Sequence, residues 1–570
     1  MKRWEVKSPI TPEAFQELQD YPPAFKQIIF NRECDTQELA RQYLDATPPQ
    51  GADPEKLWGL PEAVDRIVWG VQKNESIVIY GDYDVDGVTS TALLVQVLQG
   101  LGAQVRPYIP NRFDDGYGLN IEALDSIKAS QAGLVITVDC GIRSFEEIEH
   151  AKRLGLDVIV SDHHHPKGEI PRALSVINPK QEGDEYPYKD LAGVGLAYKL
   201  ALALIKHYER ANHHSKSRME PDSLLDLVAL GTVADIAPLV GENRALVRTG
   251  LEVIKLMGRQ GLNALIGVSG LQPNRIKATH IGYILGPRLN AAGRLESALD
   301  ALRLLTTNDI HIAVSLAQKL DDQNQKRQNL TQETQYYAEQ LALADDSDPL
   351  LLFAAHEDFS PGIIGLAASK LTDMYNRPSI VAQIGVEETR GSCRSIPEFH
   401  ITMALDQCSE LLEHHGGHSA AAGFTVRNEN LPALVEKLQS IAVEKLSDRD
   451  LRPVLTADLE IPLRELKPDL LQYLEMMQPT GYGNPEAVFI SRDLQVKYAR
   501  LVGREGSHLK LAVSDGWVTY DAIAFRQGHW LENLPAYIDL IYSFESNEYN
   551  GRVSLQLNVQ DLKPSGTPDI

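Results

Sequence analysis

The sequence is poor in cysteine. Only four occur in 570 residues, at Cys34, Cys140, Cys393 and Cys408, and no two of them form a CxxC pair. A disulfide framework or a zinc ribbon needs closely spaced cysteines. The sequence therefore predicts neither, and the cysteine content fits a reducing cytoplasm.

Long apolar runs are also absent. No stretch of 18 consecutive apolar residues occurs, and Met1–Ile10 has two early basic residues with no apolar core behind them. A membrane-spanning helix and a signal peptide both require such apolar segments. We therefore expect neither secretion nor a membrane partner.

Positive charge is in deficit. The chain has 55 Lys and Arg against 78 Asp and Glu, a formal net charge of −23. A protein that coats duplex nucleic acid by bulk electrostatics needs a surplus of Lys and Arg at the contact. That class is excluded, whereas a local basic track is not. A cluster of acidic metal ligands would contribute to the negative total.

Two common catalytic motifs are missing as well. The chain contains no GxxxxGKS or GxxxxGKT loop and no HExxH segment, so a P-loop ATPase and a zincin are unsupported. Gly193-Val194-Gly195 lacks the third glycine of a dinucleotide fingerprint. We interpret it as a tight turn into the helix that follows.

What is present is an ordinary globular composition, with 43% hydrophobic and 23% charged residues. At roughly 150 residues per domain, the length predicts three or four domains. From Ser76 to about Val240, short apolar runs alternate with helical stretches, which is typical of βαβ units around a parallel sheet covered on both faces. Strands are predicted at Ser76–Tyr80, Val105–Ile109, Leu134–Val138 and Asp157–Ser161, and helices at Thr89–Gln99 and Phe145–Leu154.

A polar helical connector and a second α/β block follow. Between Leu299 and Ala344, Ile312, Leu316 and Leu320 recur at helical spacing on one stripe. The second block has predicted strands at Leu350–Ala355, Ser379–Ile384 and Ala422–Val426, and helices at Ile363–Met374 and after Leu431.

The last part of the chain changes period. After the Pro- and Gly-rich segment Gln478–Pro485, apolar residues alternate at Val518–Ala524 and at Val553–Val559, with Asn550-Gly551 as a hairpin signal. We therefore predict an α/β multidomain protein that ends in a small all-β domain. Its predicted parts are a helical extension (1–75), a parallel-sheet domain (76–297), a connector helix (298–346), a second α/β domain (347–447), the all-β domain (448–563) and a tail (564–570).

Acidic residues and histidines follow three successive strands of the predicted parallel sheet. Gly81-Asp82-Tyr83-Asp84-Val85-Asp86-Gly87 comes directly after the first, Asp139-Cys140-Gly141 after Leu134–Val138, and Asp162-His163-His164-His165 after Asp157–Ser161. Ligands of open parallel sheets bind outside the carboxyl ends of the strands. These side chains should therefore converge, joined by Asp235 at the end of an apolar helical run.

A single Asp after a strand is more often a helix N-cap or a turn residue than a ligand. Three strands that all end in this way, with adjacent histidines, favour a metal site instead. Carboxylate and imidazole ligands without thiolate favour Mg²⁺ or Mn²⁺. Two such ions would activate water and stabilise the leaving oxygen of a phosphoester.

These motifs resemble those of the DHH phosphoesterases. GDYDVDG, VDCG, SDHHH and GTVAD match the successive motifs of that family. Further segments narrow the resemblance to its RecJ group, the single-strand-specific 5′→3′ exonucleases: Ile109–Phe113, Asp115–Leu119, Leu285–Arg294, Arg390–Ser395, Gly416-Gly417-His418 and Pro479–Pro485. The resemblance covers about residues 50–560. It implies a DHH domain, a connecting helix, a DHHA1 domain and an OB-like domain, arranged around a hole that admits one strand.

The resemblance also implies roles for particular residues. The implied metal ligands are Asp82, Asp84, Asp86, Asp139, His163 and Asp235. His164 is implied to contact the substrate phosphate and Asp162 to orient the histidines, so Asp84, Asp86, Asp139, Asp162 and His164 are the expected catalytic residues. Smaller DHH enzymes have a histidine where this chain has Tyr80, which leaves open which of the first three aspartates bridges the ions.

For the substrate, the resemblance points to loops rich in Gly, Pro and Asn. Arg112, Arg288 and Arg394 are implied as contacts to the strand or its 5′-phosphate, because a guanidinium binds phosphate in a bidentate manner. Asn290, Ser395, Gly417 and His418 complete the implied substrate-binding set. For Tyr117 and Phe359, base stacking and core packing are both open. The OB-like domain would hold the incoming strand.

The predicted function is single-stranded-DNA exonuclease activity in recombination and repair, with two Mn²⁺ or Mg²⁺ ions. A single-strand-binding protein or a helicase is a candidate partner. One alternative is a DHH phosphodiesterase of short oligonucleotides or signalling dinucleotides, which would not need the added β domain. Another is a non-catalytic replication scaffold that has lost metal ligands, whereas every implied ligand is present here.

Overall fold

The computed structural model describes residues 2–111, 118–211, 220–344, 346–549 and 552–569. The chain forms two compact units. The larger contains Lys2–Asn290, Ala298–Gln318 and Val454–Ile570, and the smaller contains Ala291–Ser297 and Lys319–Pro453. In the described part of the chain, no helix has the length and apolar character needed to cross a membrane.

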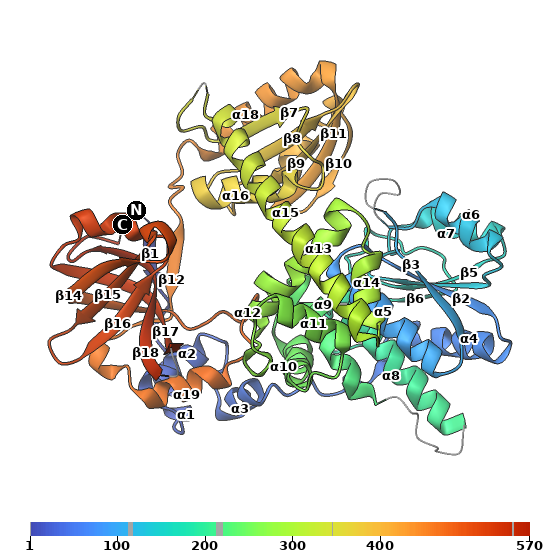
Figure 1. The fold of residues 1–570 in the computed structure, drawn as a ribbon, viewed down its shortest axis with the longest axis horizontal. Coiled ribbons are helices and arrows are strands. Elements are labelled where there is room, and N and C mark those ends of the chain that lie inside the picture. The colour runs from blue at the N-terminus through green and yellow to red at the C-terminus, as the bar shows by residue number, and fades with distance from the viewer. Residues whose placement is uncertain (1, 112–117, 212–219, 345, 550–551, 570) are drawn as a thin grey trace. The chain divides into compact units, whose positions relative to one another are not determined.

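A five-stranded parallel sheet organises the first domain of the larger unit (Figure 1). Its strand order is β3-β2-β4-β5-β6, with bounds β2 Ser76–Gly81, β3 Gln104–Tyr108, β4 Leu134–Val138, β5 Asp157–Ser161 and β6 Ser175–Ile177. Ile77, Val78, Ile79 and Tyr80 are fully buried, so both faces of the sheet are covered. The predicted parallel sheet is confirmed.

Four helices connect and cover these strands: α5 Val85–Gly100, α6 Ile121–Ala129, α7 Phe145–Arg153 and α8 Gly193–Ala211. Helix α5 begins four residues before the predicted Thr89. The reason is the N-cap, because the Asp84 carboxylate accepts a hydrogen bond from the backbone N–H of Gly87 (3.1 Å). The carboxylate-rich loop therefore leads directly into a helix N-terminus.

Further helices follow: α9 Leu225–Ala234, α10 Gly241–Lys255, α11 Gln260–Val268, α12 Ala278–His280 and α13 Gly286–Leu295. The predicted long helix is present as α15, Ile310–Ala342, and is preceded by a shorter helix, α14, Leu299–Thr306. The Asp309 carboxylate starts α15 by accepting hydrogen bonds from His311 and Ile312. Of the predicted apolar stripe, Leu316 and Leu320 are buried, whereas Ile312 is 40% exposed.

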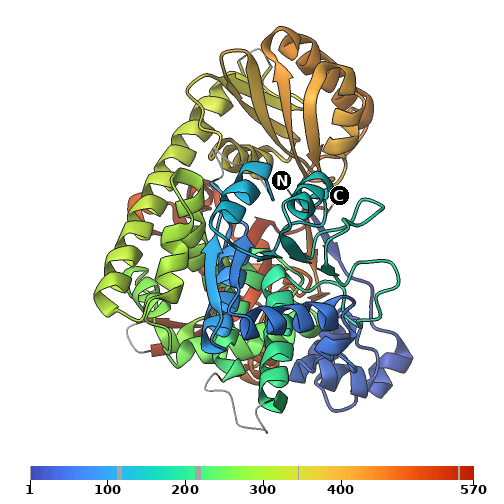
Figure 2. The ribbon, with the colours of Figure 1, turned by 90° about the vertical axis from the view of Figure 1, so that its right-hand side faces the viewer.

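The smaller unit contains a mixed five-stranded sheet with order β10-β11-β9-β8-β7. Its strands are drawn in yellow and orange tones in Figure 2. Its elements are β7 Leu352–His356, α16 Ile364–Tyr375, β8 Ser379–Ile384, β9 Glu388–Arg394, α17 Ile401–Asp406, β10 Leu412–Gly417, β11 Ala421–Arg427 and α18 Leu431–Leu446. Strands β7 and β8 are parallel and the other pairs are antiparallel. Cys393, in the centre of this sheet, is fully buried in an apolar cluster.

The C-terminal part of the larger unit is the predicted all-β domain. Its six strands have the order β13-β14-β15-β16-β18-β17, and β14 also pairs with β17, which closes the sheet. The bounds are β13 Leu459–Glu460, β14 Phe489–Val502, β15 His508–Ser514, β16 Thr519–Ala524, β17 Tyr537–Tyr549 and β18 Arg552–Pro564. Ala522, Ala524, Leu557 and Val559 are buried as the alternation predicts, whereas Val553, in the same alternation, is 68% exposed. Asn550 and Gly551 lie outside the described residues.

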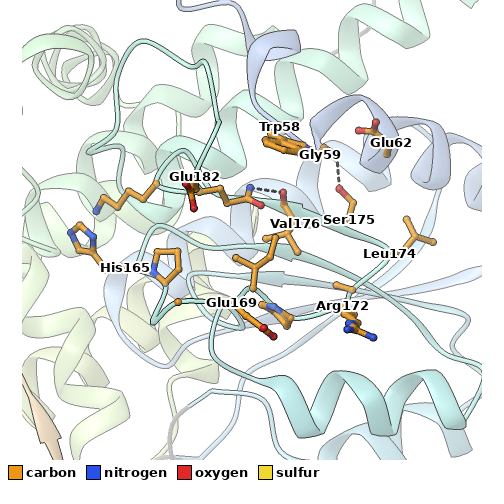
Figure 3. A pocket seen from close by; sticks show the side chains of 17 residues that line it. Trp58, Gly59, Glu62, His165, Glu169, Arg172, Leu174, Ser175, Val176 and Glu182 are labelled. Atoms are coloured by element: carbon orange, nitrogen blue, oxygen red, sulfur yellow. Dashed lines mark hydrogen bonds between the residues drawn. The ribbon is translucent and has the colours of Figure 1, made fainter.

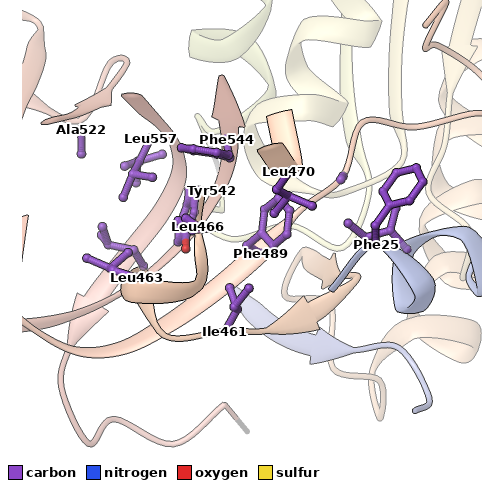
Figure 4. Close-up of a cluster of buried hydrophobic side chains, with 14 of the residues drawn as sticks. Phe25, Ile461, Leu463, Leu466, Leu470, Phe489, Ala522, Tyr542, Phe544 and Leu557 are labelled. Atoms are coloured by element: carbon purple, nitrogen blue, oxygen red, sulfur yellow. The ribbon is translucent and has the colours of Figure 1, made fainter. Parts of the chain in front are cut away.

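The N-terminal segment packs into this β domain, which sequence periodicity did not predict. Strand β1, Arg3–Val6, pairs in parallel with β12, Val454–Ala457. The N-terminal helices are α1 Pro12–Glu17, α2 Pro23–Phe30, α3 Gln37–Asp45 and α4 Leu60–Gln72. Phe25 of α2 shares one apolar core with Phe489 and with Leu470 of α19, Pro468–Met476 (Figure 4). The two ends of the sequence therefore form a single folded part.

Arg244 on α10 joins this part to the parallel-sheet domain. The residue is 2% exposed, and its guanidinium donates to the backbone carbonyls of Tyr43, Met476, Met477 and Gln478. It also lies over the Tyr43 ring, 4.3 Å from the centroid. Among the described residues, no carboxylate pairs with it. The C-terminal carbonyls of α19 are the acceptors that stabilise the buried charge.

We predict that Arg244→Met lowers the free energy of unfolding by about 2–4 kcal/mol, because it leaves buried carbonyls without donors. The measurement is the midpoint of urea unfolding followed by tryptophan fluorescence. Arg41→Met, on the exposed face of α3, is the matched control and should have almost no effect. Equal midpoints for the two variants would contradict this role of Arg244.

Candidate active site

Three carboxylates lie on the loop after β2 and on the first turn of α5. Asp82 follows the strand and is 4% exposed, Asp84 caps α5, and Asp86 lies in the first helical turn and is 1% exposed. The chain reverses there because Gly87 has no side chain. A Cβ on Gly87 would lie 2.5–2.7 Å from backbone atoms of Asp82. The strand end therefore delivers all three carboxylates to one edge of the sheet.

Asp86 connects this loop to the start of α8. Its two carboxylate oxygens accept hydrogen bonds from the backbone N–H groups of Gly193 and Val194, both at 2.7 Å. The predicted turn into a helix at Gly193 is thus a helix N-terminus that faces a carboxylate. Gly193 permits the approach, since a Cβ there would lie 2.9 Å from the Cβ of Asp139 and 3.1 Å from Asp86 Oδ2.

His163 brings the ends of β4, β5 and α9 together. Its Nε2 lies 3.1 Å from Asp139 Oδ1, 3.7 Å from Asp235 Oδ2 and 4.0 Å from Asp86 Oδ2. Asp139 has a φ of +62°, an unusual conformation for a non-glycine residue, at the point where its side chain enters the cluster. Residues about 150 positions apart in the sequence therefore meet at one histidine nitrogen.

Asp162 orients the second histidine. Its Oδ1 accepts hydrogen bonds from the His164 backbone N–H (3.0 Å) and lies 2.7 Å from His164 Nδ1, while Oδ2 accepts from the Ile142 N–H (2.9 Å). The rings of His163 and His164 are 4.5 Å apart. The Asp162 carboxylate is thus directed at His164 and at backbone, and the orienting role that the resemblance implied stays a prediction.

Burial and mutual repulsion dominate the electrostatics of the cluster. Desolvation and the charge of Asp84 raise the pKa of Asp86 to about 7, and desolvation and Asp86 raise the pKa of Asp235 to about 9. The pKa of Asp139 rises well above its usual range for the same two reasons. Desolvation and His164 lower the pKa of His163 to about 3. The His163 imidazole therefore resists protonation, and the carboxylates around it favour the binding of a cation.

The pKa of His164, the partner of Asp162, shifts in the opposite direction to that of His163. Burial alone would lower the pKa of His164, but the hydrogen bond and charge of Asp162 outweigh it, so this pKa is raised. Burial alone would raise the pKa of Asp162, but His164 reverses the shift and lowers it. Both shifts favour the ion-paired form of Asp162 and His164, beside the carboxylate cluster.

The ligand atoms fit a divalent metal. Three sets have their ligand atoms within 4.8 Å of one another: Asp82, Asp84 and Asp139; Asp86, His163 and Asp235; and Asp139, His163 and His164. Asp139 Oδ1 and His163 Nε2 are buried and, although 3.1 Å apart, make no hydrogen bond with each other or with any other described residue. Buried polar atoms normally have partners, so these two atoms mark where a cation would bind. The oxygen-rich donor set with imidazole and no thiolate suits Mn²⁺ or Mg²⁺.

Asn290 is the member of the predicted substrate set that reaches this cluster. From α13, its Oδ1 accepts a hydrogen bond from the backbone N–H of Val85 (3.2 Å), between Asp84 and Asp86. It therefore positions the metal-binding loop itself. Arg288, on the same helix, donates to the Ile284 carbonyl one turn earlier (2.8 Å). Arg112 and Tyr117 lie outside the described residues.

The remaining predicted substrate residues form a second group in the smaller unit. Arg394 ends β9 and pairs in register with Ala421, and Gly417 ends β10 and pairs with Ala422. The Ser395 N–H donates to the Ala420 carbonyl (2.9 Å), and the His418 N–H donates to the Ala421 carbonyl (2.7 Å). All four residues therefore lie at the same end of this sheet. Phe359 is 5% exposed and lies in an apolar cluster, so it packs in the core.

Two residues near the metal loop were missed by sequence reasoning. Asn178 is fully buried, donates to the His164 carbonyl (2.9 Å) and accepts from the Lys180 N–H (2.9 Å). The positive charge of Lys180 acts on both His163 and Asp235. No periodicity or spacing marks them, because only the turn after β6 brings them to the histidines.

We predict that Mn²⁺ stabilises the protein, by about 2.7 kcal/mol at a hundredfold excess over the dissociation constant. Asp139→Asn should stabilise the metal-free protein, because it removes repulsion, and should abolish most of the gain from Mn²⁺. The measurement is thermal unfolding with Mn²⁺ or with chelator. Asp125→Asn, an exposed carboxylate on α6, is the control. An undiminished Mn²⁺ effect in Asp139→Asn would disprove the ligand assignment.

Comparisons with known proteins match all three domains. The chain matches the DHH family, N-terminal domain at residues 76–232, the DHHA1 domain at 348–444 and the RecJ OB domain at 457–561. These matches agree with the predicted α/β multidomain architecture and confirm the resemblance to DHH proteins.

Similar proteins span nearly the whole chain. The single-stranded-DNA-specific exonuclease RecJ of Bacillus subtilis is 37% identical over 569 residues, which cover 99% of this chain and 71% of that protein. The Escherichia coli protein of the same name is 34% identical, with 96% of each chain covered. The crystal structure of Thermus thermophilus RecJ with Mn²⁺ has a TM-score of 0.84 at 30% identity and covers 99% of this chain and 80% of its own. The structure with Mg²⁺ has a TM-score of 0.79 at 29% identity and covers 99% of this chain and 79% of its own. The chain therefore belongs to the RecJ family of DHH phosphoesterases.

Proposed function

We propose that this chain is a single-stranded-DNA exonuclease that hydrolyses phosphodiester bonds from the 5′ end with two divalent cations. The observation that carries the proposal is the buried cluster in which two ligand sets, Asp82–Asp84–Asp139 and Asp86–His163–Asp235, lie side by side around His163 and Asp139. Membership of the RecJ family, whose named members act on single-stranded DNA, supports the choice of substrate.

The two sets divide the metal binding between them. Asp82, Asp84 and Asp139 would hold one ion, and Asp86, His163 and Asp235 the other. When bound, such ions lower the pKa of water and stabilise a leaving oxygen. Asp86 also accepts hydrogen bonds from two backbone N–H groups of α8. These bonds fix its carboxylate and do not use all of its lone pairs. The protein thus supplies anionic ligands, of which Asp86 is already held in place by hydrogen bonds.

His164 would bind the scissile phosphate. Its Nδ1 is engaged by Asp162 at 2.7 Å, so the Nε2–H of the protonated ring is its donor toward substrate. A positively charged donor next to the metal ligands would stabilise negative charge on a phosphate oxygen. Asp162 therefore acts through His164, as a positioning residue.

Recognition of the strand's leading end is assigned to the arginine set. Arg112, Arg288 and Arg394 are the proposed contacts to the 5′-phosphate or the strand, with Ser395, Gly417 and His418 beside Arg394. A planar guanidinium suits a terminal phosphate dianion. Burial lowers the pKa of Arg394, and its Nη1 donates to the Cys393 carbonyl (2.8 Å), so its guanidinium is held in place.

The OB domain offers a face for the strand. Arg500 on β14 lies opposite Lys510 on β15, and Tyr498 lies opposite Ala512 on the same face. Tyr498 is 54% exposed, and Phe525, also more than half exposed, packs edge-on against His508. Lys510 Nζ also pairs with Asp521 Oδ2 (3.0 Å). Exposed aromatic rings and cations on one face are features that bind single strands without sequence preference.

The OB face and the complete ligand cluster disfavour the two alternative functions. A phosphodiesterase of short oligonucleotides or dinucleotides has no use for this OB face, and a non-catalytic scaffold has no use for a complete ligand cluster. We assign the exonuclease to recombination and repair in the cytoplasm, where four buried free thiols are compatible with the reducing conditions. A single-strand-binding protein or a helicase is the proposed kind of partner.

The first prediction concerns metal and polarity. With Mn²⁺, a single strand labelled at its 5′ end should lose the label first, as a mononucleotide, and chelator should stop the reaction. Asp139→Ala should lower kcat by at least about a thousandfold, since metal assistance contributes several kcal/mol. Asp125→Ala should retain full activity. Early release of a 3′ label would refute the polarity, and rapid turnover by Asp139→Ala would refute the metal assignment.

The second prediction concerns binding of the strand by the OB domain. Arg500→Gln combined with Lys510→Gln should weaken binding of a 40-mer and leave cleavage of a 5-mer nearly unchanged. The slope of log Kd against log salt concentration should fall by about 1.4, or roughly 0.7 per lost phosphate contact. Lys437→Gln with Lys445→Gln, on α18, provides the control. An unchanged slope would mean that the strand does not cross this face.

A further inference from the structure

A large cavity within the larger unit begins at His165, the residue after His164 (Figure 3). Its volume is about 830 Å³, and its walls come from Trp58–Glu62, from the β5–β6 connection after His165, and from the turn Lys180–Glu182. The proposed reaction uses none of these side chains. A cavity of this size fits a bound ligand or several residues of a peptide.

The floor of the cavity is preformed. Gly59 begins α4 with a φ of +82°, and a Cβ there would collide with the Val176 carbonyl. Ser175 Oγ donates to the Gly59 carbonyl (2.5 Å), and Gln181 Nε2 donates to the Val176 carbonyl (2.9 Å). This last bond occupies the outer edge of strand β6. An occupant is therefore held by side chains and not as an added strand.

An exposed aromatic ring and apolar residues line the cavity. Trp58 is 57% exposed; its backbone N–H donates to Asp184 Oδ2 (2.9 Å), and a Cβ on Gly183 would lie 2.9 Å from the indole. Ile170 and Leu174 are 39% and 43% exposed. Large apolar side chains that stay exposed in a concave site indicate a surface that a partner covers.

The charges around the ring are mainly negative. Glu62, Glu169 and Glu182 line the cavity, and within the described residues none of their carboxylates has an ion-pair partner. The cations Arg172 and Lys180 also line the cavity. Lys180 Nζ lies 3.7 Å from Asp190 Oδ1, so only the charge of Arg172 is left to offset the three carboxylates. An occupant that complements this surface is positively charged and partly apolar.

We propose that this cavity binds a segment of a partner protein in which an Arg or Lys side chain is flanked by apolar residues. The cation lies over the Trp58 indole, where the ring quadrupole attracts it, and the carboxylates of Glu62 and Glu182 neutralise it. Its methylene stem and the flanking residues cover Ile170 and Leu174. An acidic segment is repelled, so the site selects by charge.

The probes are two synthetic peptides of equal length, acetyl-Leu-Arg-Leu-Arg-Leu-amide and acetyl-Leu-Glu-Leu-Glu-Leu-amide. Binding to the full chain is measured by calorimetry at low salt. We expect the Arg peptide to bind at least about tenfold more tightly than the Glu peptide. Trp58→Ala should weaken its binding by about fivefold, the effect of one exposed cation–π contact. The triple variant Glu62→Gln, Glu169→Gln, Glu182→Gln should abolish the preference.

Two controls separate this site from the rest of the molecule. Trp517→Ala, an exposed indole of the OB domain, should bind the Arg peptide as the unaltered chain does. All variants should cleave a 5-mer at the unaltered rate, which shows that they are folded. Equal binding of the two peptides, or no effect of the triple variant, would overturn the proposal. Tighter binding of a deoxynucleoside monophosphate than of the Arg peptide would also overturn it and assign the cavity to the reaction product.

Discussion

Repulsion between buried carboxylates is the constraint on which the catalytic domain depends. Asp82, Asp86 and Asp139 are at most 4% exposed, and Asp84 and Asp235 act on them at short range. Burial of like charges is unfavourable unless a cation neutralises them. The pKa values of Asp86 and Asp235 are raised for this reason. Metal binding and the stability of this domain are therefore linked.

The surrounding fold holds the carboxylates together against this repulsion. The N-terminus of α8 directs two amides at Asp86, and a positive helix end stabilises an anion there. Gly193 and Gly231 lie where a Cβ would meet Asp86 or Asp139 at about 3 Å. Hydrogen bonds of Asn290 and Asn178 hold the loops that carry Asp84 and His164. Asp86, Asp139 and the loops that carry Asp84 and His164 are thus fixed by backbone hydrogen bonds or by close packing.

Chemistry and strand binding are placed on different architectures. The catalytic side chains follow the ends of parallel strands, where three loops converge at one edge. The proposed strand-binding face is the outer surface of an antiparallel sheet, where alternate residues point to solvent. Arg244 and the N-terminal helices join these two parts, since Phe25 and Ile28 of α2 lie in the core of the β domain. The N-terminal segment therefore contributes to the OB domain although it begins the chain.

The sequence by itself determined the parallel sheet, the all-β end and the identity of the acidic and histidine motifs. Buried strands have continuous apolar runs, and Asp139 and Asp162 follow such runs directly. Only the tertiary structure decided that Asp86 faces α8, that Asn178 supports His164, that Phe359 packs in the core, and that the N-terminal helices complete the β domain. Local sequence encodes periodicity and turns, whereas these contacts join residues from 14 to more than 400 positions apart. They form because distant elements bury a common apolar surface, which no local pattern specifies.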